Sequence, residues 1–237
     1  MKRLITIVFI LISLTSNSNA QISVSVYGAA SIPTGSFSDY YNSAFGFRGN
    51  IFYATSENAQ YFLNSGFNVW KFNNDKFNDW FHNNGGVGIF SLEIPITVVP
   101  LLAGARYSVD YNRRTKIFLE AALGVYFITS NASGKFTDNT GTYDAGNEKH
   151  NYTEFTLHVG GGTTIALGRK FSLDIGAYFD VITNSEAAKQ AKTKNSKDYY
   201  DSSRVTTLIF CAGLNYQFQA TDFLKFFIED NQNEKHN

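Results

Sequence analysis

The fifteen residues Lys170–Asn184, KFSLDIGAYFDVITN, alternate between apolar and polar side chains with a period of two. Successive residues of a β-strand point to opposite faces, so this pattern predicts a strand with two different faces. One face is apolar throughout: Phe171, Leu173, Ile175, Ala177, Phe179 and Val181. The other face carries Asp174 and Asp180. In a soluble barrel the apolar face would lie inside, whereas in a membrane barrel it would meet lipid and the aspartates would point into the lumen.

The composition is that of a folded β protein. Of 237 residues, 43% are hydrophobic, 16% are aromatic and only 17% are charged, which argues against disorder. The formal net charge is zero, so no nucleic-acid partner is indicated. Cys211 is the single cysteine, and no disulfide framework is therefore expected.

The first twenty residues have the pattern of a secretory signal peptide. Lys2 and Arg3 precede the apolar run Leu4–Leu14, and Ser18-Asn19-Ala20 provides a small-x-small cleavage site. The apolar run is too short for a membrane-spanning helix, which needs about 20 residues. We expect residues 1–20 to be removed on export. An exported chain without helical spans can enter a membrane only as a closed barrel.

Period-two alternation recurs through the rest of the chain and predicts eight strands, an even number. They are about Gln21–Ile32, Ala44–Ala54, Gln60–Phe72, Ser91–Val109, Lys116–Thr129, Glu154–Leu167, Lys170–Asn184 and Arg204–Phe218. In the fourth strand, Ile94, Ile96 and Val98 share one face, and Leu101 and the alternate residues after it share the next apolar face. This change of phase predicts a β-bulge near Val99-Pro100, because a bulge is one of the few places where a strand accepts proline.

The connections between these strands alternate in length. Those after the second, fourth and sixth strands are short: Thr55–Ala59, Asp110–Thr115 and Gly168–Lys170. Those after the first, third, fifth and seventh strands are long: Pro33–Ser43, Asn73–Phe90, Ser130–Thr153 and Ser185–Ser203. Short periplasmic turns and long external loops are typical of outer-membrane barrels. The apolar faces are nearly free of charge and the lysines lie mostly in loops, so we predict that the apolar faces meet lipid.

The chain resembles the outer-membrane β-barrel domain family of Gram-negative bacteria, and in particular the PorT-like and small OmpA/OmpX-type barrels. The resemblance rests on the processing site and on four further motifs: Ile32-Pro33-Thr34-Gly35-Ser36-Phe37, Ile94-Pro95-Ile96, Leu123-Gly124-Val125-Tyr126 and Tyr216-Gln217-Phe218. It implies an eight-stranded antiparallel up-and-down transmembrane barrel over residues 21–218, in the bacterial outer membrane. It also implies that the barrel-assembly machinery reads the ending at Phe218.

Residues 219–237 extend beyond that ending as a short periplasmic tail. Phe223, Phe226 and Phe227 have the spacing of an amphipathic helix, which predicts a helix at the inner-leaflet interface or under the barrel mouth. The alternative is that the segment Phe223–Ile228 continues the last strand or forms the true assembly signal.

Eight strands enclose only enough space for side chains, so the lumen is expected to be a packed polar core with paired charges. If the turn Asp110–Thr115 pairs Tyr107 with Leu119, Arg106 lies opposite Glu120. If the turn Gly168–Lys170 pairs Leu167 with Phe171, His158 lies opposite Asp180. These four residues are predicted to form two structural lumen pairs.

No catalytic, cofactor or metal site is predicted. Glu154 shares a face with His158, but four strand residues place them about 13–14 Å apart, and no inward serine offers a nucleophile. His82, His150 and His236 lack metal-ligand spacing. Gly160-Gly161-Gly162 lacks the lysine and helix of a phosphate loop and is expected to admit bulky lumen neighbours or bend the strand.

Two external loops carry candidate contact residues. Phe77, Trp80 and Phe81 have helical spacing, which predicts a loop helix packed on the barrel rim or a recognition patch. Lysines in the last long loop either contact lipopolysaccharide phosphates or are simply solvated: Lys189, Lys192, Lys194 and Lys197.

The sequence thus favours a non-enzymatic outer-membrane barrel whose external loops serve surface interaction, adhesion or envelope assembly. The expected partners are outer-membrane lipids and lipopolysaccharide, the barrel-assembly machinery, and an envelope or surface protein that the sequence does not identify. The alternatives are an outer-membrane enzyme that hydrolyses lipid or peptide, and a small transport channel.

Overall fold

The computed structural model describes residues 21–183 and 204–218. The predicted signal peptide, the tail 219–237 and the four loop lysines lie outside this part of the chain and stay predictions. The described elements are β1 (Gln21–Thr34), η1 (Gly35–Asp39), β2 (Ala44–Ala54), β3 (Ala59–Trp70), α2 (Asn74–Asn83), β4 (Ile89–Glu93), β5 (Ile96–Asn112), β6 (Thr115–Asp138), β7 (Gly141–Ala166), β8 (Phe171–Thr183) and β9 (Arg204–Phe218).

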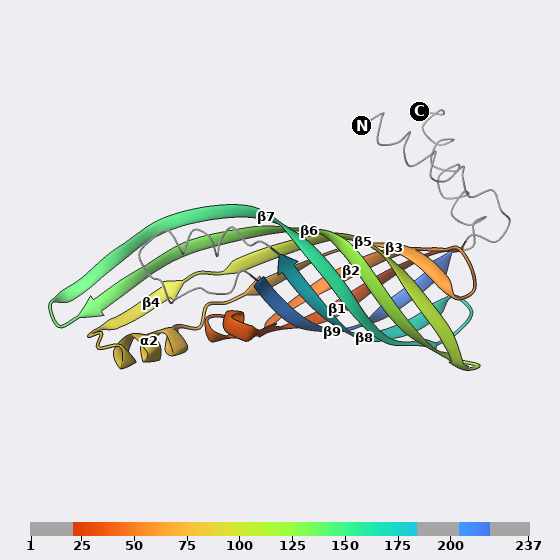
Figure 1. The fold of residues 1–237 in the computed structure, drawn as a ribbon, viewed down its shortest axis with the longest axis horizontal. Coiled ribbons are helices and arrows are strands. Elements are labelled where there is room, and N and C mark those ends of the chain that lie inside the picture. Colours follow the sequence, from red (N-terminus) through yellow and green to blue (C-terminus); the bar gives the residue numbers. More distant parts are fainter. Residues whose placement is uncertain (1–20, 184–203, 219–237) are drawn as a thin grey trace, which may run out of the picture.

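Eight of these strands form a closed antiparallel barrel (Figure 1). Going round the ring, β1 pairs with β2, β2 with β3, β3 with β5, and each later strand with the next, until β9 returns to β1. The short turns lie at one end of the barrel, and β4, α2 and the tip of the β6–β7 hairpin lie beyond the other end. The predicted eight-stranded up-and-down barrel is confirmed.

The fourth predicted strand is interrupted at a different proline from the one expected. β4 and β5 are separated at Ile94-Pro95, and β5 then pairs with β6 through Val99 and Pro100 without a shift of register. The predicted bulge at Val99-Pro100 is wrong. Ile96 and Val98 pack in an apolar cluster inside the barrel. Their side chains therefore point into the lumen and do not face lipid, so no change of phase is needed at Pro100.

Pro100 is tolerated within β5 because pairing with the neighbouring strand lapses there. The register joins Ser65 to Leu101 and Asn68 to Val98, with no paired residues between them. A proline has no backbone N–H to give to a ladder, so it fits where one ladder is interrupted. The Ser65 hydroxyl donates a hydrogen bond of 2.9 Å to the Pro100 carbonyl.

The predicted loop Ser130–Thr153 is a β-hairpin, not an irregular loop. β6 and β7 are 24 and 26 residues long and remain paired from Thr115–Ile165 to Asp138–Gly141. β4 pairs with the distal part of β6, from Ile89–Thr137 to Glu93–Ser133. We call β4, α2 and the distal parts of β6 and β7 (131–138 and 141–153) the platform.

Helix α2 is fastened to the outer edge of β4 by side chains four residues apart. Asn74 exchanges two hydrogen bonds with the backbone of Leu92, at 2.7 and 2.8 Å. Asn78 exchanges two with Phe90, both at 2.8 Å, and the His82 Nε2 lies 2.7 Å from the Gly88 carbonyl oxygen. These side chains bond backbone groups that a neighbouring strand would otherwise pair, which is one way to protect a sheet edge.

Aromatic rings fill the space between α2 and the sheet. Phe77 and Phe81 lie with ring centroids 5.4 and 5.0 Å from Phe90, and Phe90 lies 4.6 Å from Phe136 of β6. The helix predicted from the spacing of Phe77, Trp80 and Phe81 is therefore present, and it packs on β4 and the distal part of β6. Within the described residues, no helix has the length and apolarity needed to cross a membrane.

The outward face of the long hairpin changes character along its length. In β6 the outward residues are apolar up to Phe127 and polar from Thr129 onwards; in β7 the change falls between Phe155 and Thr153. Phe127 and Thr153 are paired, so both strands change at the same level. The apolar stretch of β6 begins at Ile117 and spans eleven residues, which matches a tilted membrane strand of 9–11 residues.

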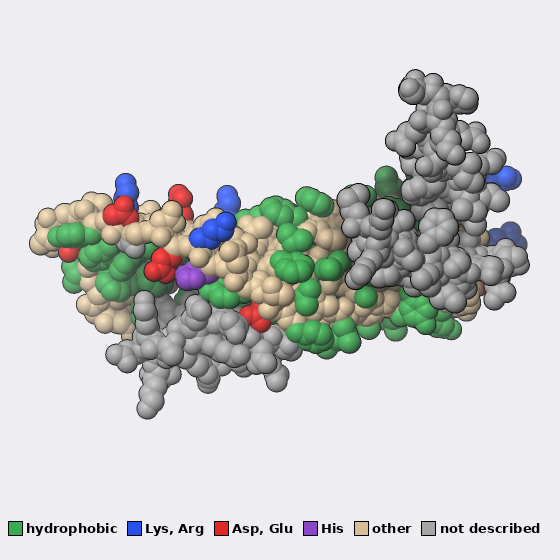
Figure 2. Space-filling model, turned by 90° about the horizontal axis from the view of Figure 1, so that it is seen from above, with side chains coloured by type: hydrophobic (Ala, Val, Ile, Leu, Met, Phe, Trp, Pro, Cys, Tyr) green, Lys and Arg blue, Asp and Glu red, His purple; other side chains and the backbone are tan. Residues whose placement is uncertain are grey.

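Figure 2 shows hydrophobic side chains spread over the visible barrel surface. Exposed apolar residues come from all eight barrel strands and include Val26, Phe47, Leu63, Leu101, Leu123, Leu157, Ile175 and Leu214. The platform, at the other end of the same view, displays several charged side chains. An apolar belt of this extent on a closed barrel is the surface that meets the hydrocarbon core of a membrane.

The interior is not uniformly polar as expected. Towards the platform end, an apolar cluster fills the lumen: Ala44, Phe52, Phe62, Trp70, Val98, Leu102, Ala122, Tyr126 and Ile182. Phe37 of η1 packs on this cluster with its ring centroid 5.9 Å from that of Trp70. We call this cluster, with Phe37, the plug. The rest of the core holds charged and neutral polar side chains together with a second buried cluster: Tyr27, Ala29, Phe118, Tyr178, Ile209 and Cys211.

Candidate functional site

Arg106 of β5 and Glu120 of β6 lie directly opposite each other inside the barrel. Their pairing follows from the tight connection between the two strands, which sets the register from Asp110–Lys116 inwards. The Arg106 Nε donates to Glu120 Oε2 at 2.8 Å, and both side chains are only 2% exposed. The structure thus brings together the first of the two predicted pairs.

His158 of β7 and Asp180 of β8 are likewise paired across their two strands. The His158 Nδ1 lies 2.5 Å from Asp180 Oδ1, and its Nε2 lies 3.3 Å from Glu120 Oε1. His158 therefore joins the second pair to the first. The ring also stacks on Tyr178, with centroids 4.9 Å apart.

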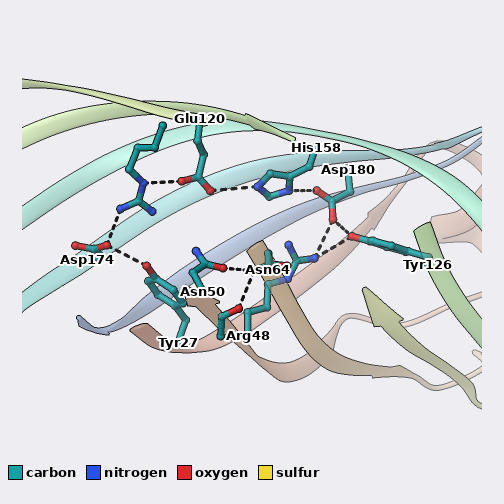
Figure 3. Close-up of polar contacts among 11 residues, drawn as sticks. Tyr27, Arg48, Asn50, Asn64, Glu120, Tyr126, His158, Asp174 and Asp180 are labelled. Carbon is teal, nitrogen blue, oxygen red and sulfur yellow. Dashed lines mark hydrogen bonds and ion pairs between the residues drawn. The ribbon is translucent and has the colours of Figure 1, made fainter. Parts of the chain in front are cut away.

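Four further residues extend these pairs into one network, drawn in Figure 3. The Arg106 Nη1 donates to Asp174 Oδ2 at 2.8 Å, and the hydroxyl of Tyr27 donates to the same oxygen at 3.0 Å. At the other end, Arg48 Nη2 donates to Asp180 Oδ2 at 2.8 Å and to the hydroxyl of Tyr126 at 3.0 Å. Tyr126 also bonds Asp180.

Alternation places these four added residues on the polar faces of their strands, but it does not join them to the pairs. Arg48 and Asp180 are 132 positions apart, and Arg106 and Asp174 are 68 apart. A tight turn fixes only which residues of adjacent strands face each other. Contacts across the lumen depend on closure of the ring, and alternation carries no signal for them.

The guanidinium group of Arg106 lies over two aromatic rings. Its Cζ lies 4.3 Å from the ring centroid of Phe52 and 3.8 Å from that of Phe118. Cation–π contacts of this kind are strengthened when the cation is desolvated. Removing one member of a buried charge network leaves its partners without compensation and costs about 3–5 kcal/mol. The network links side chains from six of the eight barrel strands: β1, β2, β5, β6, β7 and β8.

The network offers little that resembles a catalytic arrangement. Both nitrogens of His158 are engaged by carboxylates, and no described serine or threonine hydroxyl is hydrogen-bonded to it. Glu154 is buried on the same face of β7. Among the described residues, no group of three or more His, Cys, Asp or Glu side chains is arranged to hold a metal ion.

Glycines make room for the aromatic members of the core. A Cβ at Gly160 would stand 2.4 Å from Tyr178 Cδ1, and one at Gly162 would stand 2.7 Å from Phe118 Cζ. The glycine run of β7 thus admits bulky lumen neighbours, the first of the two roles predicted for it, because any larger residue would collide with these rings.

A closed eight-stranded barrel with an apolar belt outside and a hydrogen-bonded charge network inside defines the class of the protein: it is an outer-membrane β-barrel. Only helices and closed barrels satisfy every backbone group in hydrocarbon. In this class the short turns are periplasmic and the long connections are external.

Solved structures similar to this chain are outer-membrane barrels. Neisserial surface protein A is 16% identical, with 84% of this chain and 97% of that chain covered and a TM-score of 0.44. A major outer membrane protein from Thermus thermophilus is 15% identical, with 84% and 99% covered and a TM-score of 0.48. Ail, the attachment invasion locus protein of Yersinia pestis, is 14% identical, with 84% and 98% covered and a TM-score of 0.40.

No protein-family model matches the chain, and no curated protein sequence matches it. The solved structures have TM-scores below 0.5, so no functional role is transferred from them.

Proposed function

We propose that this protein is a non-enzymatic outer-membrane barrel whose external platform serves surface interaction, adhesion or envelope assembly. The observation that carries the proposal is the platform itself, because it extends beyond the apolar belt as ordered sheet and helix rather than as irregular loops. Ordered elements present side chains at fixed positions, which lowers the entropy cost of binding a partner.

The platform exposes large apolar side chains outside the lipid belt. Trp80, Ile89 and Tyr143 are each at least 41% exposed. Exposed aromatic and aliphatic residues outside a membrane belt are typical anchors of protein interfaces. The partner we expect is an envelope or surface protein, with lipopolysaccharide a further expected contact of the external face.

Two observations favour this role over transport. The plug fills the lumen towards the platform end with side chains such as Trp70 and Phe52, which are at most 2% exposed. The charge network fills the adjacent part of the core. A steady conductance in planar bilayers would favour a channel instead.

The enzymatic alternative receives no support from the described core, since His158 is fully engaged by two carboxylates. Loss of lipid or peptide hydrolysis on His158→Ala would favour it.

The finer resemblance, to PorT-like and small OmpA/OmpX-type barrels, is part of this proposal and rests on the sequence motifs. Recognition of Phe218 by the barrel-assembly machinery rests on the same motifs.

The test replaces the platform hairpin, residues 131–153, with a two-residue Asn-Gly turn in the mature chain. We expect the shortened protein to fractionate with the outer membrane and to keep heat-modifiable migration, because the barrel strands remain paired. We also expect it to lose binding to intact cells or isolated envelopes. A matched variant, Trp80→Ser with Ile89→Ser, keeps the platform and removes two exposed apolar anchors. Binding that survives both changes would refute the proposal.

A further inference from the structure

The barrel interior has a polar cavity at the end opposite the plug. It has a volume of about 340 Å³ and is lined by residues of all eight barrel strands and of all three short turns. Neutral hydrogen-bonding side chains form much of its wall, among them Ser23, Gln60, Ser108, Thr164, Ser172 and Asn215. A cavity of this size suits a small polar group rather than a macromolecule.

Cationic side chains gather at the rim of this cavity. Arg113 and Arg114 come from the β5–β6 turn, and Arg169 and Lys170 come from the β7–β8 turn. Figure 2 shows Lys and Arg side chains at this end of the molecule (right). The two pairs are more than 50 positions apart in the sequence. They come together because both turns lie at the same end of the barrel.

The rim carries an excess of positive charge. The two carboxylates that line the cavity are those of Glu57 and Asp110, and Asp110 is already paired with Lys116 at 3.3 Å. Among the described residues, no carboxylate lies within ion-pair distance of Arg113, Arg114 or Arg169. Guanidinium groups that are not paired internally are suited to bind phosphate, whose oxygens match their planar fork.

Arg106 forms the inner end of the cavity. Its side chain is 2% exposed and its Nη2 has no hydrogen-bond partner among the described residues, although Nε and Nη1 are bonded to Glu120 and Asp174. The guanidinium lies over the rings of both Phe52 and Phe118. Phe52 also belongs to the plug, so apolar side chains lie directly behind the inner end.

We propose that the turn-end mouth of the barrel is a blind binding pocket for a phosphate group, with Arg113, Arg114 and Arg169 at its rim and Arg106 at its inner end. The phosphate enters from the periplasmic side and is carried either by a soluble phosphorylated molecule or by a lipid headgroup of the inner leaflet. The chemistry is the same for both sources.

The experiment titrates inorganic phosphate into the refolded barrel in zwitterionic nanodiscs, by calorimetry at low ionic strength. We expect saturable binding with one site per chain. The variant Arg113→Gln/Arg169→Gln should weaken binding by roughly tenfold or more, because each loses a charged hydrogen bond. The matched variant Lys135→Gln/Lys149→Gln removes the same charge from the platform and should leave binding unchanged.

A third variant separates a pocket from a charged surface. Ser108→Leu keeps every rim charge and fills part of the cavity, so phosphate binding should fall by roughly tenfold as well. Heat-modifiable migration verifies that each variant is folded. Equal weakening by the rim and platform variants, or full binding by Ser108→Leu, would show attraction to a charged surface and overturn the proposal.

Nanodiscs that contain phosphatidylglycerol distinguish the two sources. If the headgroup is the natural occupant, the anionic lipid should be retained by the wild-type barrel more than by Arg113→Gln/Arg169→Gln and should compete with inorganic phosphate. If the natural occupant is soluble, phosphate should bind equally in both kinds of disc. Failure of both phosphate binding and selective lipid retention refutes the pocket, whatever the outcome of the platform experiment.

Discussion

The proximal and distal halves of β6 follow the same alternation and are built for opposite surroundings. In the barrel half, Leu119 and Leu123 point outwards and Glu120 points inwards. In the platform half, Lys135 points outwards and Phe136 packs inwards beneath α2. Which face of β6 is apolar therefore follows the surroundings of each half: lipid lies outside the barrel half, and water lies outside the platform half. The change from lipid to water falls near Thr129.

The largest effect should come from the inward charge of the barrel half. Arg106→Met leaves Glu120 and Asp174 buried and uncompensated, so it should lower the free energy of unfolding by about 3–5 kcal/mol. Denaturant titration in detergent micelles measures the loss. Lys116→Met removes the exposed ion pair with Asp110 on the same hairpin and should cost only about 0–1 kcal/mol.

A double-mutant cycle with Glu120→Gln sharpens this result. Arg106 and Glu120 are hydrogen-bonded at 2.8 Å, so their effects should be strongly coupled. A coupling energy near zero would contradict the reading of the pair as a structural lumen contact.

The next effect concerns the outward face on either side of Thr129. Leu123→Lys places a charge in the lipid belt and should destabilise the folded barrel by about 2–4 kcal/mol near the midplane. Ser133→Lys puts the same side chain on the same face of the platform half and should have almost no effect. Comparable losses for the two variants, measured by unfolding in lipid bilayers, would place the membrane boundary elsewhere.

A smaller effect is expected where α2 covers β4. Asn78→Ala removes both hydrogen bonds to Phe90 and should cost about 1–2 kcal/mol of local stability. Faster hydrogen exchange of the Phe90 amide would report it, while the barrel amides keep their protection. Asn83→Ala changes an exposed asparagine of the same helix and serves as the control.

The smallest effect lies at the tip of the hairpin. Asp138 accepts hydrogen bonds from the hydroxyl and amide of Thr140 and from the amide of Gly141, and these hold its pKa below the ordinary value. The ionised form is therefore the one that stabilises the turn. Its contribution is complete above the ordinary pKa of about 3.9 and is lost as the pH falls through the lowered value.

Asp138→Asn should remove this pH dependence. The protection of the Thr140 amide from hydrogen exchange, measured between pH 2 and pH 6, would report it. An unchanged pH profile in the variant would mean that another group controls the turn.

The barrel could be predicted from the sequence because lipid imposes a simple rule on its strands. Alternation located all eight barrel strands, and the tight turn at residues 110–115 set Arg106 opposite Glu120. The hairpin at Ser130–Thr153 was not predicted, because its outward residues are polar beyond the lipid and such a pattern is also typical of a loop. The bulge at Val99-Pro100 was predicted wrongly because Val98 is apolar and was assigned to a lipid-facing side, whereas it is part of the plug.

The contacts of Arg48 and Asp174 could not be predicted for a different reason. They are made across the lumen, between strands that are not neighbours in the ring. They depend on the barrel closing with one particular stagger of its strands, which no single strand or turn encodes.

The fastening of α2 to β4 behaves as a vernier, two scales with nearly equal divisions. Four helical residues advance by about 6.0 Å, and two strand residues by about 6.7 Å. Asn74, Asn78 and His82 thus stay within hydrogen-bonding range of Leu92, Phe90 and Gly88. The mismatch of about 0.7 Å accumulates with every further rung, so a fourth would be displaced by about 2 Å, beyond the tolerance of a hydrogen bond. A helix can therefore cover only a short edge, and β4 has five residues.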